Sequence, residues 1–163
     1  MKIKDLFSFL LLVTLFTLLN CKKNEQAATA SPQLSYWLFS GYTFEAIKVL
    51  TNNVTGYPGI RAYDFKQDTI QFIFSGQSLS AGTYKVIQDT SLQTPFPARS
   101  CIVKMILNDY PGGVWVSIGE ALDSVSLSDS IGAYQLIFNN ITLARPDRSW
   151  DTIVTSGDIY DIE

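Results

Sequence analysis

Short apolar runs with a period of two residues fill the chain after its polar N-terminal stretch. In one of them, Ile70, Phe72 and Phe74 alternate with Gln71 and Ser75. Because successive side chains of a β-strand point to opposite faces, this period places one face of each strand in a core and the other in water. No run in this region keeps the period of a helix. The pattern therefore predicts an all-β domain.

Turn-forming residues separate the runs at short intervals. Lys66–Asp68 is placed as a hairpin turn, Gly76–Gly82 as a longer loop and Asp109–Gly113 as a tight turn. Gly, Pro, Asn and Asp are favoured at such positions because they tolerate turn backbone or fix it. Counting the runs gives about 8 to 10 strands, which predicts an antiparallel β-sandwich, with a closed lipocalin-like β-barrel as the alternative.

The alternation changes phase once near the C-terminus. An even-numbered apolar series ends at Phe138, and an odd-numbered series begins at Ile141. Asn139 and Asn140 lie between them, and asparagine tolerates the left-handed backbone that an extra residue in a strand requires. The sequence therefore predicts a β-bulge or bend at this asparagine pair.

The N-terminus has the segment order of a secretory leader. Two lysines precede a mostly apolar run of 14 residues, Leu6 to Leu19, and a polar stretch follows Cys21. The run is short for a membrane span, which takes roughly 20 residues, but it fits the hydrophobic region of a cleaved leader. We therefore expect residues 1–20 to be a helical signal segment.

The four residues Leu18-Leu19-Asn20-Cys21 resemble the lipobox of bacterial lipoproteins at Leu18 and Cys21, and depart from it at Asn20, where a small residue is usual. In that family the cysteine thiol carries diacylglycerol, and the mature chain starts at this cysteine. The resemblance makes Cys21 the expected lipidation site and the membrane an expected partner. The other interpretation is an uncleaved N-terminal anchor that ends at Cys21.

The order of lipobox, short polar tether and β-rich region resembles small all-β lipoproteins of Bacteroidota. Gly82–Tyr84, as a strand start, and the late run Phe138–Leu143 contribute to the resemblance. It implies a signal peptide over 1–20, a lipidated cysteine and tether over 21–33, and one domain over 34–163. It also implies a lipid-anchored location in the cell envelope, with the outer membrane preferred and the periplasmic or surface-exposed face left open.

Composition excludes several functional classes. From position 34 onward, 8 Lys and Arg stand against 13 Asp and Glu, a net charge of −5, which opposes the basic face that nucleic acid requires. The chain has no histidine, the commonest general base and metal ligand. Cys101 lies in an apolar run and is expected to be a buried, inert thiol. We therefore expect no cofactor, no metal site and no catalytic residues, and so no enzyme.

Exposed aromatic residues are the first candidates for a binding surface. Trp115 has the opposite parity to the valines beside it, which predicts that it faces away from the main core. Trp150 follows a polar segment that contains Arg145 and Arg148. Indole rings stack on sugar rings while nearby polar groups bind the hydroxyls, so these four residues are the predicted contacts for a glycan or an envelope protein. The alternative is that such large aromatic side chains fill the core.

The sequence supports three functional hypotheses. The first is a lipid-anchored domain with a non-catalytic binding or structural role. The second is a carrier of a small apolar ligand in a barrel interior, lined by Phe72, Phe74, Tyr84 and Phe138. The third is a hydrolase that uses carboxylates alone, for which Glu120 and Asp123, which are close in sequence, are the candidate pair.

Four Asp residues are each followed by Ser or Thr and then an aliphatic residue. This pattern resembles the O-glycosylation acceptor of exported Bacteroidota proteins, and an Asp-Ser/Thr turn at the start of a strand has the same appearance. The acceptors that the resemblance implies are Thr69, Ser124, Ser130 and Thr152.

Overall fold

The structure is a computed structural model, and it confirms the all-β prediction. It describes residues 34–54, 56–89, 96–109, 113–130, 133–146 and 148–162. The described residues form eleven strands and no helix, and so no helical segment that is long and apolar enough to cross a membrane. The expected leader, Cys21 and the tether lie outside the described residues.

The strands vary from short hairpin pieces to long, bent ribbons. In chain order they are β1 (Tyr36–Phe39), β2 (Tyr42–Glu45), β3 (Lys48–Val54), β4 (Tyr57–Tyr63), β5 (Thr69–Phe74), β6 (Gly82–Val86), β7 (Ser100–Leu107), β8 (Gly113–Ser117), β9 (Ser124–Ser130), β10 (Ala133–Arg145) and β11 (Arg148–Ile162). The number exceeds the predicted eight to ten because β1 and β2 are four residues each, too short to stand out as alternating runs.

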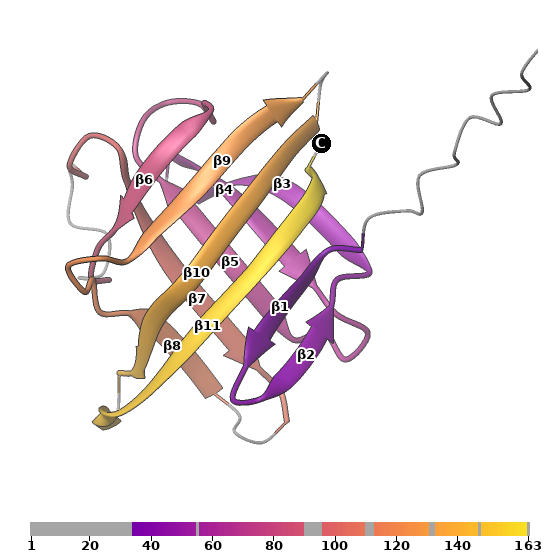
Figure 1. Ribbon diagram of the computed structural model, residues 1–163, viewed down its shortest axis with the longest axis vertical. Helices are drawn as coiled ribbons and strands as arrows, with labels where there is room; N and C mark the ends of the chain where they lie inside the picture. Colours follow the sequence, from indigo (N-terminus) through magenta and orange to yellow (C-terminus); the bar gives the residue numbers. More distant parts are fainter. Residues whose placement is uncertain are drawn as a thin grey trace, which may run out of the picture. The chain divides into compact units, whose positions relative to one another are not determined.

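Five strands close into a ring in which β6, β9, β10, β8 and β7 pair in that order and β7 pairs back to β6. Two series of paired strands continue the sheet beyond this ring. The first continues from β7 through β5 and β4 to β3, and the second continues from β10 through β11 and β1 to β2. Figure 1 shows β9, β10 and β11 lying in front of β4, β5 and β7. The domain thus combines the two predicted architectures, with sandwich-like layers that a small barrel closes at one side. Only the β6–β7 pair is parallel among the described pairs.

Aromatic side chains from both layers fill the interior. Phe72 of β5 meets Phe138 of β10 with ring centroids 4.9 Å apart, and Phe74 meets Tyr84 with centroids 4.8 Å apart. All four side chains are at most 1% exposed. The carrier hypothesis predicted that these residues line a ligand cavity, but they contact one another. The packing of the interior therefore does not support that hypothesis.

Strand β5 corrects the expectation of one buried and one wet face, because all six of its residues are buried. The segment that leaves β6 lies against the outer face of this layer at two points. The Asp89 carboxylate pairs with Lys104 Nζ of β7 at 2.8 Å, and the Phe96 ring stacks on Tyr57 of β4 with centroids 4.4 Å apart. Contacts from a segment this distant in sequence cannot be predicted from the alternation of residues within β5.

The predicted bulge at the asparagine pair is confirmed. The register of β10 against β11 shifts between Phe138 and Ile141, and Asn140 has a φ of 54°. The Asn140 N–H donates to Ser156 Oγ at 2.8 Å instead of to the ladder. As a result, Phe138 and Ile141 are both buried, at 1% and 0% exposure, despite their opposite parity.

Cys101 is fully buried in β7, as predicted. Burial raises the pKa of its thiol well above the usual value, because the thiolate has no water around it. The thiol is therefore protonated and unreactive in the folded domain.

Candidate functional site

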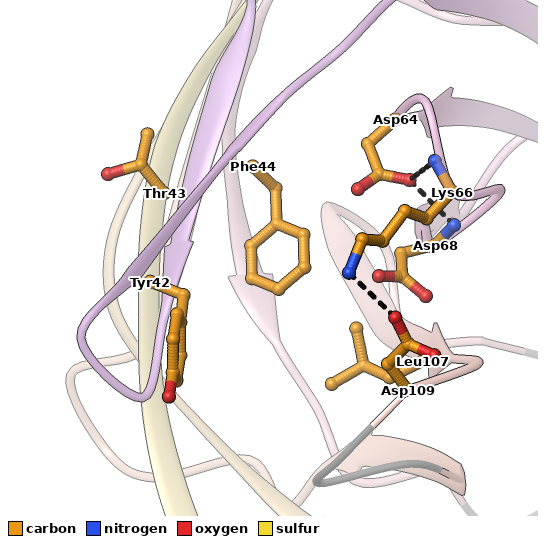
Figure 2. Close-up of a pocket in the computed structure, with 8 residues that line it drawn as sticks. All are labelled: Tyr42, Thr43, Phe44, Asp64, Lys66, Asp68, Leu107 and Asp109. Carbon is orange, nitrogen blue, oxygen red and sulfur yellow. Dashed lines mark hydrogen bonds and ion pairs between the residues drawn. The ribbon is translucent and has the colours of Figure 1, made fainter.

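A pocket of about 260 Å³ lies between the two layers, where edge strand β2 faces the turn between β4 and β5. Figure 2 shows the lining as two walls, with aromatic side chains of β2 on one side and charged side chains on the other. The lining residues are Tyr42, Thr43 and Phe44 of β2, Asp64, Lys66 and Asp68 of the turn, and Leu107 and Asp109 at the end of β7.

The aromatic wall continues from solvent into the core. Tyr42 is 63% exposed at the rim, whereas Phe44 is half-buried. The pairing of β2 with β1 places Phe44 opposite Trp37, and the two rings stack with centroids 5.3 Å apart and planes 5° from parallel. Because Trp37 is fully buried, this stack fixes the inner part of the wall, and Tyr42 is its accessible face.

The charged wall is built on the β4–β5 turn, which confirms the predicted hairpin. Asp64 Oδ1 accepts hydrogen bonds from the backbone N–H groups of Lys66 at 2.9 Å and Asp68 at 2.8 Å. Gln67 takes the left-handed conformation, with φ of 65°. The Asp68 carboxylate in turn accepts the backbone N–H of Asn108 at 2.7 Å. Both carboxylates are thus held in place before any ligand arrives.

Burial shapes the electrostatics of this wall. Asp64 is 8% and Asp68 is 2% exposed. Burial raises the pKa of Asp64, the neighbouring Asp68 charge adds to the rise, and the two backbone hydrogen bonds oppose it. At the rim, Lys66 Nζ pairs with Asp109 Oδ2 at 2.7 Å, and this hydrogen bond raises the pKa of Lys66. Three carboxylates against one ammonium give the pocket a formal charge of −2.

The pocket offers hydrogen-bond acceptors and an aromatic face more readily than a metal site. Among the residues that the structure describes, no group of three or more His, Cys, Asp and Glu is placed to hold a metal ion. The carboxylates accept hydrogen bonds, Lys66 donates them, and Tyr42 presents a ring for apolar contact. Such a combination suits a compact ligand that has both C–H faces and donor groups.

The structure corrects the expectation for Trp115. Its side chain is 4% exposed, and its ring meets Phe39 edge-on with centroids 5.2 Å apart. The reason is the pairing of β8 with β7, which puts Trp115 opposite Met105, a core residue. Val114 beside it is the side chain that faces outward, at 44% exposure. The alternation correctly predicted that Trp115 and Val114 lie on opposite faces of the strand. The prediction of which face lies in the core was wrong.

The other predicted ligand residues lie at the β10–β11 connection. Arg145 stands over the Trp115 ring, with Cζ 5.9 Å from its centroid, so the structure brings these two together. Arg148 pairs with Arg145 in the backbone register, but the side chains of Arg148 and Trp150 lie outside what the structure describes. Arg145 also borders a second pocket of about 330 Å³, lined by Gln88, Asp89, Val116, Ser117, Ile118, Ala144, Arg145 and Pro146.

The two acids considered for a hydrolase have different surroundings. Glu120 is exposed, whereas Asp123 is 5% exposed. The Asp123 carboxylate accepts the backbone N–H of Thr142 at 3.0 Å, and its backbone carbonyl accepts the N–H of Val86 at 2.9 Å. Asp123 thus joins β9, β10 and β6 in the role of a structural residue.

The four proposed glycosylation acceptors differ in accessibility. Thr152 is exposed and Ser124 is half-buried. Thr69 is 6% exposed and its hydroxyl donates to the carbonyl of Gln67 at 3.2 Å, so the folded domain does not present it to a glycosyltransferase. The side chain of Ser130 lies outside the described residues. The modification itself stays a prediction.

Sequence reasoning did not find the pocket. Asp64 appears in the sequence as an isolated acid, and Tyr42 as one of many aromatic residues. The spacing of Asp64 and Asp68 around a turn is a weak signal, and the pairing that carries Tyr42 to the opposite wall is long-range. No family model, no curated protein and no solved structure matches this chain.

Proposed function

We propose that this chain is a lipid-anchored protein of the cell envelope whose β-domain binds a carbohydrate, without catalysis, in the pocket between β2 and the β4–β5 turn. The observation that carries the proposal is the exposed Tyr42 ring opposite the recessed carboxylates of Asp64 and Asp68. The C–H face of a sugar packs on an aromatic ring, and its hydroxyls donate to carboxylates through charge-assisted hydrogen bonds.

The size of the pocket limits the size of the ligand. Its volume of about 260 Å³ lies just below the roughly 300 to 1,000 Å³ of sites for drug-sized molecules. One sugar residue, such as the end of a glycan chain, is therefore a better fit than an extended oligosaccharide. The formal charge of −2 favours neutral or amino sugars over acidic ones.

The location in the proposal rests on the lipobox-like residues before Cys21. We expect palmitate fed to the producing bacterium to label the full-length protein, and the label to disappear in Cys21→Ala. Cys101→Ala is the matched control, because it removes the only other cysteine and should keep the label. Absence of label from the unaltered protein, or its survival in Cys21→Ala, would contradict lipid anchoring at this position.

Glycan binding should depend on both walls of the pocket. On a glycan array followed by calorimetry, we expect Tyr42→Ala to weaken binding by about tenfold or more, equivalent to about 1.4 kcal/mol. We expect Asp64→Asn to weaken binding as well while the turn survives, because the Asn Oδ1 still accepts the two backbone N–H groups that Asp64 holds.

Phe65→Ala is the matched control for these variants. Phe65 lies on the same turn, is 83% exposed, and does not line the pocket. Its replacement should leave the affinity unchanged. Equal losses in Phe65→Ala and Tyr42→Ala would move the site elsewhere, and an array without any binding would refute the carbohydrate proposal.

A further inference from the structure

Among the described residues that line the pocket beside β2, Lys66 is the one cation, and it is loosely held. Its Nζ pairs with Asp109 Oδ2 at 2.7 Å, and the two side chains are 63% and 64% exposed. Figure 2 shows the Lys66 side chain extending from the β4–β5 turn toward the space between the two walls. Exposed ion pairs are weak because water and salt screen them. Lys66 can therefore leave Asp109 at little cost while its backbone N–H stays bonded to Asp64.

The two buried carboxylates of the same wall hold oxygens in reserve for a ligand. Asp64 and Asp68 are 8% and 2% exposed. The three backbone N–H groups that reach them in the described part of the chain, from Lys66, Asp68 and Asn108, all donate to Oδ1 atoms. Burial and the neighbouring Asp68 charge both raise the pKa of Asp64, because two adjacent negative charges out of water are unfavourable. A cationic group bonded to the Oδ2 atoms would remove this penalty.

The aromatic wall also favours a cation. The faces of aromatic rings carry negative electrostatic potential and attract ammonium groups within about 6 Å. Tyr42 is 63% exposed at the rim, and half-buried Phe44 lines the pocket further in. A ligand in the pocket thus has aromatic rings on one side and carboxylates on the other. A hydroxyl bonds to the carboxylates alone, whereas an ammonium interacts favourably with both walls.

We propose that the ligand of this pocket is a sugar with a free amino group, and that Lys66 is an internal competitor that the amino group displaces. The inference rests on the proposed carbohydrate function and adds to it the group that decides specificity. The ammonium of the sugar donates to the Oδ2 atoms of Asp64 and Asp68. Lys66 then turns toward solvent, because the two ammonium groups repel each other. An N-acetylated sugar has no charge at this position and gains none of these interactions.

Matched sugars test the specificity. Glucosamine, galactosamine and mannosamine are each titrated into the full-length protein in detergent, beside the parent hexose and the N-acetyl derivative, with calorimetry as the readout. We expect at least one hexosamine to bind about tenfold more tightly than both of its uncharged counterparts, and added salt to reduce this advantage. If the hexoses bind and the amine gives no advantage, the inference is wrong while the carbohydrate proposal stands. If no sugar binds, the carbohydrate proposal is refuted and the inference with it.

Replacement of Lys66 by methionine tests the competition. Lys66→Met keeps the length of the side chain and the backbone N–H that Asp64 accepts, but removes the competing charge. We expect about fivefold tighter binding of the preferred hexosamine and little change for its parent hexose.

Lys85→Met is the matched control, because it removes an exposed lysine far from the pocket. Lys85 lies opposite Ser100 at the start of β7, whereas the pocket includes Leu107 at the end of that strand. The control should bind the hexosamine with unchanged affinity. Unchanged or weaker hexosamine binding in Lys66→Met would overturn the role of Lys66 as a competitor. Equal gains in the two lysine variants would overturn it as well, since they would reflect net charge alone.

Discussion

Replacing Phe138 by alanine is expected to lower the free energy of unfolding by about 3 to 5 kcal/mol. Phe138 is 1% exposed and meets Phe72 of the opposite layer with ring centroids 4.9 Å apart. Its ring also covers Gly157 of β11, where an added Cβ would lie 2.6 Å from Phe138 Cζ. Truncation therefore removes the contact between the layers and leaves a cavity that neither Phe72 nor the glycine fills. Such a loss is a large part of the roughly 5 to 15 kcal/mol that stabilises a typical domain.

Urea unfolding followed by tryptophan fluorescence measures this change. The matched control is Ile137→Ala on the same strand, because Ile137 is 39% exposed on the outer face. We expect this control to cost less than half as much as Phe138→Ala, with a similar dependence on urea. Similar losses for both variants would mean that the layers are not joined through Phe138.

The same strand shows what local sequence reveals about this fold. The phase change between Phe138 and Ile141 was visible because both series of apolar residues belong to one continuous strand. A bulge there allows both series to be buried, and the left-handed Asn140 supplies it. Strands, turns and bulges of this kind are predictable because their causes lie within a few residues of each other.

The errors arose where the cause was distant in sequence. The alternation of Trp115 with Val114 is the same whichever of the two faces the core. Only the pairing with Met105 of β7 decides that the indole faces inward. The outer face of β5 is also buried, and Asp89 and Phe96, from the segment after β6, contact its neighbours β7 and β4. The pocket beside the β4–β5 turn depends on β1 and β2, a hairpin whose strands have four residues each. Register and layer packing set these features, and neither leaves a periodic signal in the sequence.

The second large effect is expected at Gly119, which follows β8. Gly119 has a φ of 73°, and a Cβ added there would lie 2.6 Å from the backbone nitrogen of Gln88 and 3.0 Å from the carbonyl carbon of Ile87. The same two segments are joined by the Ser117 hydroxyl, which donates to the Ile87 carbonyl at 2.6 Å, and by the Asp89 N–H, which donates to the Ser117 carbonyl at 3.1 Å. Gly119 therefore lies where the chain leaving β8 packs closely against the backbone of the chain leaving β6.

Gly119→Ala is expected to cost about 2 to 5 kcal/mol, because a left-handed conformation costs an L-residue about 1 to 2 kcal/mol and overpacking adds about 1 to 3 kcal/mol. Gly41→Ala separates the two contributions. Gly41 has a φ of 79° but nothing within 4 Å of an added Cβ, so it should show the conformational cost alone. The difference between the two variants in urea unfolding then measures how tightly β6 and β8 are held together. An equal loss of unfolding free energy in both variants would mean that the Ile87–Gln88 backbone shifts without cost. In that case the contacts of Ser117, and not close packing, would hold this side of the barrel together.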